Sequence, residues 1–237
     1  MNDTRKRRPT LQDIADLTGV TKMTVSRYLR DPSAVAEGTR ERIAAAVEEL
    51  GYIPNRAPDM LSNATSKAIG ILIPSLSNQV FSAVIHGIEA VTRPAGYQTL
   101  LAHYGYSPER EEEQVASLLS YNVDGLILSD TQHTERTRKM IATAGIPVVE
   151  TMDLPLSPID MVVGMDHRAA ARAMVTEMLR RGRRKVVYLG ARLDVRTQLR
   201  MEGYYQAMAD FGLDGQHLLT EQSSSFTLGG ELLEQAM

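Results

Sequence analysis

The most constraining feature of this 237-residue sequence is the spacing of three residues near its N-terminus. Ala15, Gly19 and Val25 stand in the pattern Ala-x3-Gly-x5-Val. A small alanine lets two helices cross closely, and a glycine can adopt the left-handed conformation of a tight turn. A valine six residues later packs back onto the first helix. This spacing predicts a helix-turn-helix; the alternative is an ordinary αα-hairpin.

The second helix of this pair, expected over residues 22–29, has two different faces. Val25, Tyr28 and Leu29 recur at helical spacing and predict one buried stripe. Thr21 is a good N-cap, so the first amides of the helix face outward. Such a helix suits the major groove of DNA, with its N-terminal side chains on base edges. The side chains that lie off the stripe are Lys22, Met23, Ser26 and Arg27.

Two further helices complete a predicted three-helix headpiece over residues 1–54. Thr10 and Asp13 form a capping box at the start of the first helix. A third helix is expected from about residue 39 to Leu50, with Gly51 as its stop. The inward-facing residues are expected to be Leu11, Ile14, Ala15 and Leu17 in the first helix and Ile43, Ala46, Val47 and Leu50 in the third.

Four motifs in this region carry a resemblance to a known family. They are residues 11–15 (LQDIA), 19–21 (GVT), 24–27 (TVSR) and 49–55 (ELGYIPN), and they resemble the headpiece of the lactose-repressor family of bacterial transcription regulators. Within that family, residues 74–76, 78–81, 101–106 and 222–225 are most similar to regulators of gluconate use. Two departures are Ala36, where the family usually has a serine cap, and Pro58-Asp59, where an Ala-Arg pair is commoner.

The resemblance implies specific roles in DNA binding. Lys22, Met23 and Arg27 would read bases, while Thr21, Thr24 and Ser26 would mainly hold phosphates. Residues 55–66 would form a hinge helix and linker, with Leu61 wedged between base steps of the minor groove. A segment this short is not stable alone in water, so it should fold only on DNA or against a second copy. Its expected DNA contacts are Asn55, Arg56 and Leu61.

The charge distribution agrees with a DNA-reading head on a separate body. The net charge is −3, but residues 1–30 carry seven Lys or Arg against three acidic residues. Residues 68–237 carry fifteen basic residues against twenty acidic ones. A basic head attracts phosphate, although a solvated basic tail would show the same charge.

From Ile69 onward, the pattern changes to an α/β alternation. Short apolar runs at residues 69–73, 98–102, 125–128 and 147–150 are separated by helical stretches near 79–93, 109–121 and 134–144. The alternation resumes with runs at 161–164 and 185–189 and helices near 167–181 and 195–211. It predicts parallel sheets flanked by helices. The family resemblance implies a two-lobed sensor like the periplasmic sugar-binding proteins, with lobes at residues 67–159 and 160–237.

The ligand of an open α/β sheet sits outside the carboxyl ends of its strands. The residues expected there to bind effector are Ser75, Asn78, Phe81, His103, Tyr104, Asp153, Asp166, Arg192, Arg196 and Arg200. Arg200 also matches the family's effector-binding arginine, and its planar guanidinium suits the carboxylate of a sugar acid. For each residue the alternative is a loop position or a helix cap. Ser129, Asp130 and the polar residues 222–225 are further candidates.

The sequence lacks the residues that several kinds of binding site and catalysis require. There is no cysteine, and none of the five histidines forms a spaced metal-binding pair, so we expect no cofactor and no metal. No nucleophile elbow or glycine-rich phosphate loop is present. The Glu111-Glu112-Glu113 run is expected to be the solvated start of a helix. No apolar run reaches membrane length and no signal-peptide core follows the basic start, so we expect a cytoplasmic bacterial protein.

These observations favour a homodimeric repressor that binds double-stranded operator DNA and releases it when a sugar acid, with gluconate the first candidate, enters the cleft. One alternative is a cytoplasmic sugar-binding protein without a DNA role, and another is a sugar-modifying enzyme on this scaffold. Repressor and activator are not separable from sequence. Because family members continue beyond the position of Met237, we expect the second lobe to be truncated, either naturally or as a fragment.

Overall fold

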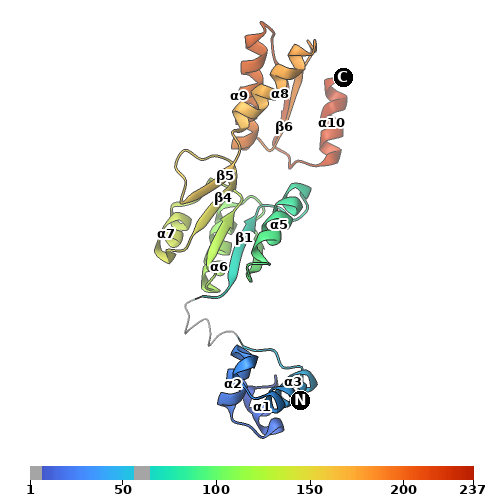
Figure 1. The fold of residues 1–237 in the computed structure, drawn as a ribbon. Helices are drawn as coiled ribbons and strands as arrows, with labels where there is room; N and C mark the ends of the chain where they lie inside the picture. Colours follow the sequence, from blue (N-terminus) through green and yellow to red (C-terminus); the bar gives the residue numbers. More distant parts are fainter. Residues whose placement is uncertain (1–6, 56–64) are drawn as a thin grey trace, which may run out of the picture. The chain divides into compact units, whose positions relative to one another are not determined.

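The computed structural model describes residues 7–55 and 65–237, which fall into two compact units, Met1–Ala64 and Thr65–Met237 (Figure 1). We describe each unit by itself. The hinge helix expected at residues 55–63, including Arg56 and Leu61, lies outside the described residues except for Asn55.

The first unit is a small helical domain. It contains α1 (Leu11–Thr18), α2 (Lys22–Arg30), the short 3-10 helix η1 (Pro32–Ala34) and α3 (Glu37–Leu50). Their core is built from residues that the spacing marked as inward-facing: Ile14, Ala15, Val25, Ile43 and Ala46. The predicted helix-turn-helix is therefore confirmed.

Local capping interactions fix the ends of these helices. The capping box between Thr10 and Asp13 is present, and Thr21 caps α2 through the amide of Thr24. Gly19 has a φ of 67°, in the left-handed region where a side chain would be strained. Ala36 makes no side-chain cap, yet α3 begins immediately after it, earlier than predicted.

One prediction about the first helix is wrong. Leu17 was expected in the core but is 51% exposed. Thr18 is buried in its place, with its hydroxyl donating to the carbonyl of Ile14 at 2.7 Å. Thr18 lies four residues after Ile14 and three after Ala15, so it is beside both buried residues, whereas Leu17 neighbours only Ile14.

The second unit begins with a five-stranded parallel sheet in the order β2-β1-β3-β4-β5. Its strands are β1 (Ala68–Ile73), β2 (Gln98–His103), β3 (Gly125–Leu128), β4 (Val148–Met152) and β5 (Met161–Gly164). Because the chain passes from β1 outward to β2 and then back to β3, the direction of winding reverses between β1 and β3. Ligands of such sheets bind at this reversal.

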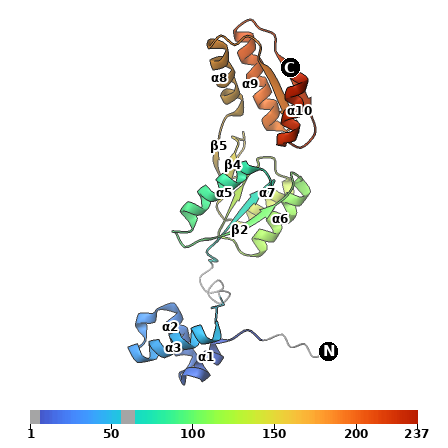
Figure 2. The same ribbon diagram turned by 90° about the vertical axis from the view of Figure 1, so that its right-hand side faces the viewer.

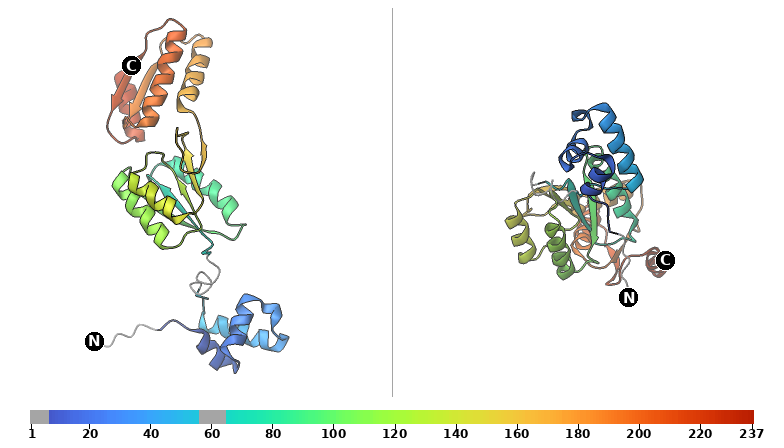
Figure 3. Two further views of the ribbon diagram at one scale, coloured as in Figure 1. Left: turned by 90° about the vertical axis from the view of Figure 1, so that its left-hand side faces the viewer. Right: turned by 90° about the horizontal axis from the view of Figure 1, so that it is seen from below.

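Helices cover both faces of this sheet. Helix α5 (Gln79–Thr92) lies on one face, and α6 (Pro108–Ser120) and α7 (Glu135–Ala144) lie on the other (Figures 2 and 3). Under α5, Phe81 packs with Ile71 and Ile73. Under α6 and α7, a larger core forms around Leu126 and Leu128. The sheet is therefore rigid, which fixes the ends of its strands.

A second, smaller sheet follows. It pairs β6 (Val187–Ala191) with β7 (Gln216–Thr220), the latter a strand that the sequence pattern did not predict. Helices α8 (His167–Arg180) and α9 (Val195–Asp210) lie on one side of it and α10 (Phe226–Ala236) on the other (Figures 1 and 3).

The strand at residues 161–164 was expected to open the second lobe, and this is wrong. It pairs in parallel with β4, with Val149 opposite Met161, and so belongs to the first sheet. The apolar run has no feature that distinguishes the two sheets, because strand pairing is a long-range property.

Helices α8 and α9 approach each other closely at Gly203. A Cβ placed on this residue would lie 2.1 Å from the carbonyl oxygen of Arg168 in α8. The side chains around this crossing are tightly packed, with Tyr204 and Ala207 buried beside it. A residue without a side chain is therefore required at this position.

We expect Gly203→Ala to lower the free energy of unfolding of the second unit by about 1–3 kcal/mol, because the backbones of α8 and α9 must separate. Urea unfolding followed by circular dichroism measures this. Gly229→Ala in α10 is the matched control, since nothing lies within 4 Å of its Cβ position; it should leave stability unchanged or raise it by about 0.5–1 kcal/mol. Equal effects of the two substitutions would contradict the steric explanation.

Candidate functional site

Two adjoining cavities open at the carboxyl ends of the strands of the second unit. The first, which we call the acidic cavity, has a volume of about 420 Å³. The second, the serine-rich cavity, has a volume of about 750 Å³. The acidic cavity is lined by Tyr104, Gly105, Tyr106, Pro108, Glu111, Asp130, Thr131, Gln132, Asp153, Arg192, Asp194, Val195, Arg196, Glu221 and Ser223. The serine-rich cavity is lined by Pro74, Ser75, Leu76, Ser77, Asn78, Gln79, His103, Gly105, Tyr106, Arg192, Ser223, Ser224, Ser225 and Phe226.

Arg192 and Tyr106 belong to both linings and form the boundary between the cavities. The guanidinium of Arg192 lies over the ring of Tyr106, 3.7 Å from its centroid, and also forms an ion pair with Asp194. Arg192 and Tyr106 both have positive φ, 67° and 61°. Non-glycine residues adopt this conformation at a cost, and such residues concentrate at binding sites.

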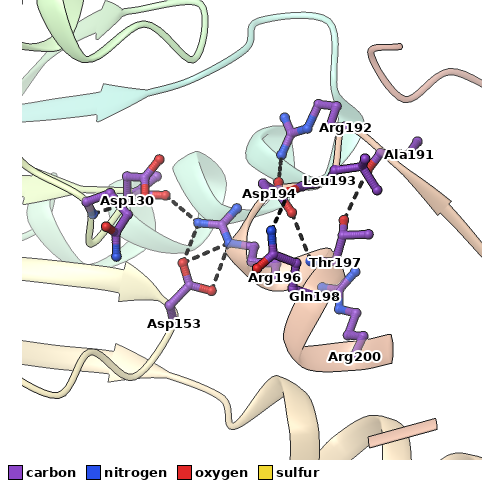
Figure 4. Close-up of polar contacts among 12 residues, drawn as sticks. Asp130, Asp153, Ala191, Arg192, Leu193, Asp194, Arg196, Thr197, Gln198 and Arg200 are labelled. Carbon is purple, nitrogen blue, oxygen red and sulfur yellow. Dashed lines mark hydrogen bonds and ion pairs between the residues drawn. The ribbon is translucent and has the colours of Figure 1, made fainter. Parts of the chain in front are cut away.

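Arg196, from the first turn of α9, joins the two sheets of the unit (Figure 4). Its Nε lies 2.8 Å from both carboxylate oxygens of Asp153, which follows β4, and its Nη2 donates to the carbonyl of Ser129 at 2.7 Å. Burial alone would lower the pKa of Arg196, but the hydrogen bonds and charge of Asp153 raise it. The guanidinium is therefore a fixed cation in the cavity wall.

The same carboxylate continues into a chain of polar contacts. Asp153 Oδ1 lies 2.7 Å from Nε2 of the buried His167, and Nδ1 of His167 accepts from Nε of Arg200 at 3.1 Å. Among the described residues, no partner is found for the terminal nitrogens Nη1 and Nη2 of Arg200. Arg192 and Arg196, by contrast, are both paired with carboxylates.

Next to this contact, the hydroxyl of Tyr104 donates to Asp130 Oδ2 at 3.0 Å. Burial of the hydroxyl and the charge of Asp130 raise the pKa of Tyr104 far above its ordinary value. The other oxygen of Asp130 accepts from the amides of Thr131 and Gln132. This wall is consequently preorganised, with its polar atoms already oriented.

A buried imidazole stands behind this wall. His133 Nδ1 lies 2.9 Å from Glu111 Oε1, and its Nε2 lies 3.4 Å from Glu150 Oε1. Burial by itself lowers the pKa of His133, but the hydrogen bond to Glu111 and the charges of Glu111, Glu150 and Asp130 outweigh it, so the pKa is raised. The imidazole thus lies between two carboxylates that favour its protonated form.

The serine-rich cavity has a different chemistry. Its lining contains no acidic residue, whereas the acidic cavity has five acidic residues against two arginines. Two helices begin at its edge, α5 capped by Asn78 and α10 capped by Ser225. The N-terminal ends of helices carry partial positive charge, so this cavity is electrostatically suited to an anion.

The structure brings most of the expected effector residues together. Tyr104, Asp153 and Arg196 line the acidic cavity, Ser75, Asn78 and His103 line the serine-rich cavity, and Arg192 lines both. Three expected residues line neither cavity. Phe81 is buried under α5, Asp166 caps α8 through the amide of Ala169, and Arg200 lies behind His167.

The prediction for Glu111 is wrong. The run at residues 111–113 was expected to be solvated, but Glu111 is 1% exposed and lines the acidic cavity. A signal was present, because Val115 and Leu118 follow Glu111 at helical spacing and are buried on the same face. Tyr106 and Asp194 were also missed, as nothing in the local sequence marks them.

In the first unit, α2 presents the face predicted for DNA. Val25 is fully buried, whereas Met23 is 72% exposed, and Lys22 and Arg27 are exposed beside it. The hydroxyls of Thr21 and Thr24 lie 3.0 Å apart at the helix start, and Ser26 is half-buried. The long side chains at the N-terminal end of α2 are thus available to a partner.

Comparison with known proteins identifies both units. Residues 10–55 match the model of bacterial regulatory proteins of the lacI family, and residues 66–237 match that of the periplasmic binding proteins and sugar-binding domain of the LacI family. The chain belongs to the LacI family. Its relatives are transcriptional regulators, not enzymes, and it is a transcription regulator with a helix-turn-helix DNA-binding unit.

Alignments with individual relatives cover nearly the whole of this chain. The regulator GntR of Escherichia coli is 60% identical over 98% of this chain and 70% of its own length. A LacI-family regulator from Silicibacter pomeroyi has a TM-score of 0.83 at 35% identity, covering 96% of this chain and 71% of its own. The lac repressor dimer bound to operator has a TM-score of 0.79 at 25% identity, covering 97% of this chain and 71% of its own.

Two further structural features concern the described residues only. No helix among them is long and apolar enough to cross a membrane. They also contain no group of three or more histidine and acidic side chains arranged to hold a metal ion.

The raised pKa of His133 predicts a pH-dependent stability. Its folded pKa lies above the ordinary value of about 6.5, so the stabilisation is complete below that pH and is lost as the pH rises through the folded pKa. We expect His133→Gln to lower the free energy of unfolding, by an amount that shrinks from pH 6 to pH 9. Urea unfolding at each pH measures it, with the exposed His86→Gln as control. A pH-independent difference would contradict a protonated His133.

Proposed function

We propose that this chain is a repressor that binds operator DNA as a homodimer and releases it when a polyhydroxylated sugar acid, with gluconate as first candidate, binds in the two cavities. The observation that carries the proposal is the unequal charge of the two cavities on either side of Arg192. One ligand with an anionic end and a hydroxyl-bearing end matches both.

The carboxylate of such a ligand fits the serine-rich cavity. There it would meet Arg192, hydroxyls of residues 223–225 and the starts of α5 and α10, with no acidic side chain to repel it. The hydroxyls of the ligand fit the acidic cavity, because carboxylates accept hydrogen bonds from hydroxyls. A neutral sugar would leave the cationic end without a partner.

Arg200 is proposed as a further contact with the ligand. Its terminal nitrogens have no partner among the described residues, and its Nε is already oriented by His167. His167 separates Arg200 from Asp153, and Asp153 lines the acidic cavity. Because it lines neither cavity in this structure, the contact requires α9 to close toward the bound ligand.

The link to DNA is proposed to be the segment at residues 55–63. Operator affinity would fall when ligand binding changes the shape of the second unit. The solved lac repressor is a dimer on its operator, and the matched DNA-binding unit disfavours a sugar-binding protein without a DNA role.

Arg27→Ala should weaken binding to a specific site by about 5- to 150-fold, because a base contact is worth about 1–3 kcal/mol. Gel shifts on DNA selected from a random pool by the wild-type chain measure this. Glu41→Gln, an exposed change on α3, is the control. If Arg27→Ala weakened selected and random DNA equally, Arg27 would be a phosphate contact and the predicted base reading would be wrong.

Gluconate should weaken the binding of the wild-type chain to the selected DNA at a fixed salt concentration. Arg200→Ala should abolish this response and leave operator binding unchanged, because Arg200 lies in α9 of the second unit, remote from the headpiece in the chain, where it donates to His167. The same gel shift, titrated with gluconate, measures both quantities.

The matched control is Arg181→Ala, which removes the exposed arginine at the C-cap of α8 that pairs with Glu177; its response should equal that of the wild type. A wild-type chain that holds its DNA at every gluconate concentration would contradict gluconate as effector. Preserved release by Arg200→Ala would refute the role of Arg200 alone.

A further inference from the structure

Glu111 has a buried carboxylate to which neither the sequence pattern nor the proposed function assigns a role. It lies in the first turn of α6, 1% exposed, and is one of the residues that line the acidic cavity. Its Oε1 is taken by His133 Nδ1 at 2.9 Å. Its Oε2 has no hydrogen-bond partner among the described residues.

A buried carboxylate oxygen without a donor is unfavourable, because the group has lost its water and gained nothing in exchange. The neighbours of Glu111 do not supply the missing donor. Tyr104 gives its hydroxyl to Asp130, and Arg196 gives its guanidinium to Asp153 and Ser129. Because Glu111 lines the acidic cavity, a ligand hydroxyl in that cavity can supply the missing donor.

The placement of Glu111 is also fixed from behind. His133 approaches it from the loop between β3 and α7 and is held in turn by Glu150 of β4. Glu150 is anchored through its other oxygen, which accepts from the amide of Ile159 at 2.6 Å. The carboxylate of Glu111 therefore cannot turn away from the cavity without breaking a buried, charge-assisted contact.

We propose that Glu111, positioned by His133, is a specificity-determining residue that accepts a hydrogen bond through Oε2 from one of the hydroxyls at C3 to C6 of the bound sugar acid, which lie farther from the carboxylate than the hydroxyl at C2. This inference rests on the proposed sugar-acid function. It assigns recognition of the hydroxyl-bearing end of the ligand to a particular residue. It also explains why the acidic residue is buried, since the ligand provides the partner that the protein lacks.

The test is a double-mutant cycle between side chain and ligand, with binding measured by isothermal titration calorimetry. The ligands are gluconate and the four monodeoxy gluconates that lack the hydroxyl at C3, C4, C5 or C6. Glu111→Gln should weaken gluconate binding about ten- to a hundredfold, as expected for the loss of a hydrogen bond to a charged group. For one deoxy ligand, the same substitution should cause no further loss, because the partner hydroxyl is already absent.

Two more variants make the result decisive. Glu113→Gln changes an exposed acid on the same helix and should leave all five affinities unchanged. Glu111→Asp keeps the charge beside His133 but shortens the side chain by one methylene, so it should give the same pattern of non-additivity even if Glu111→Gln folds poorly.

The outcomes separate the two proposals. If the wild-type chain binds gluconate but both Glu111 variants lose affinity equally for every deoxy ligand, Glu111 has a structural role only and the present inference is overturned. If both variants bind gluconate as tightly as the wild type, it is likewise overturned. If the wild-type chain binds none of the five acids, the sugar-acid function itself fails, and the role of Glu111 fails with it.

Discussion

The second unit depends on one ion pair that joins its two sheets. Arg196 at the start of α9 binds Asp153 at the end of β4 with both partners largely buried. The removal of either partner would leave a buried charge without compensation, which typically costs several kcal/mol. The contact therefore fixes where the second sheet meets the first, and with it the position of both cavities.

Around this ion pair, the polar groups are arranged in opposing sets. Asp153 also holds His167, which holds Arg200, so one carboxylate orients three basic side chains. Asp130, which follows the Ser129 carbonyl bound by Arg196, accepts from Tyr104 and two amides. Charges that are tied to each other are already oriented before a ligand enters, which lowers the cost of ordering them on binding.

Much of the headpiece could be predicted from the sequence because its determinants are local. The capping box at Thr10, the turn at Gly19 and the buried stripe of α2 all follow from residues fewer than five positions apart. The exception is instructive. Leu17 is more apolar than Thr18, yet helical geometry places Thr18 over the core, and the threonine can satisfy its hydroxyl on the preceding turn.

The predicted sensor residues show the limit of the same reasoning. The rule that ligands meet the carboxyl ends of parallel strands correctly gathered Tyr104, Asp153, Arg192 and Arg196 around one cavity. It did not distinguish Phe81, which follows β1 closely enough in sequence but turns into the core on α5. It also passed over Tyr106, whose role depends on Arg192 stacking upon it from a distant strand end.

The sequence by itself determined most helix starts and stops, most of the alternation of strands and helices, and the exposed face of α2, because each depends on neighbours within one or two turns. Only the tertiary structure decided that the strand at 161–164 belongs to the first sheet, that the cavities differ in charge, and that Glu111 is buried against His133. Those features arise from contacts between residues that are 12 to 43 positions apart in the chain. Such contacts stabilise the fold only after the chain has closed the loops between the paired residues.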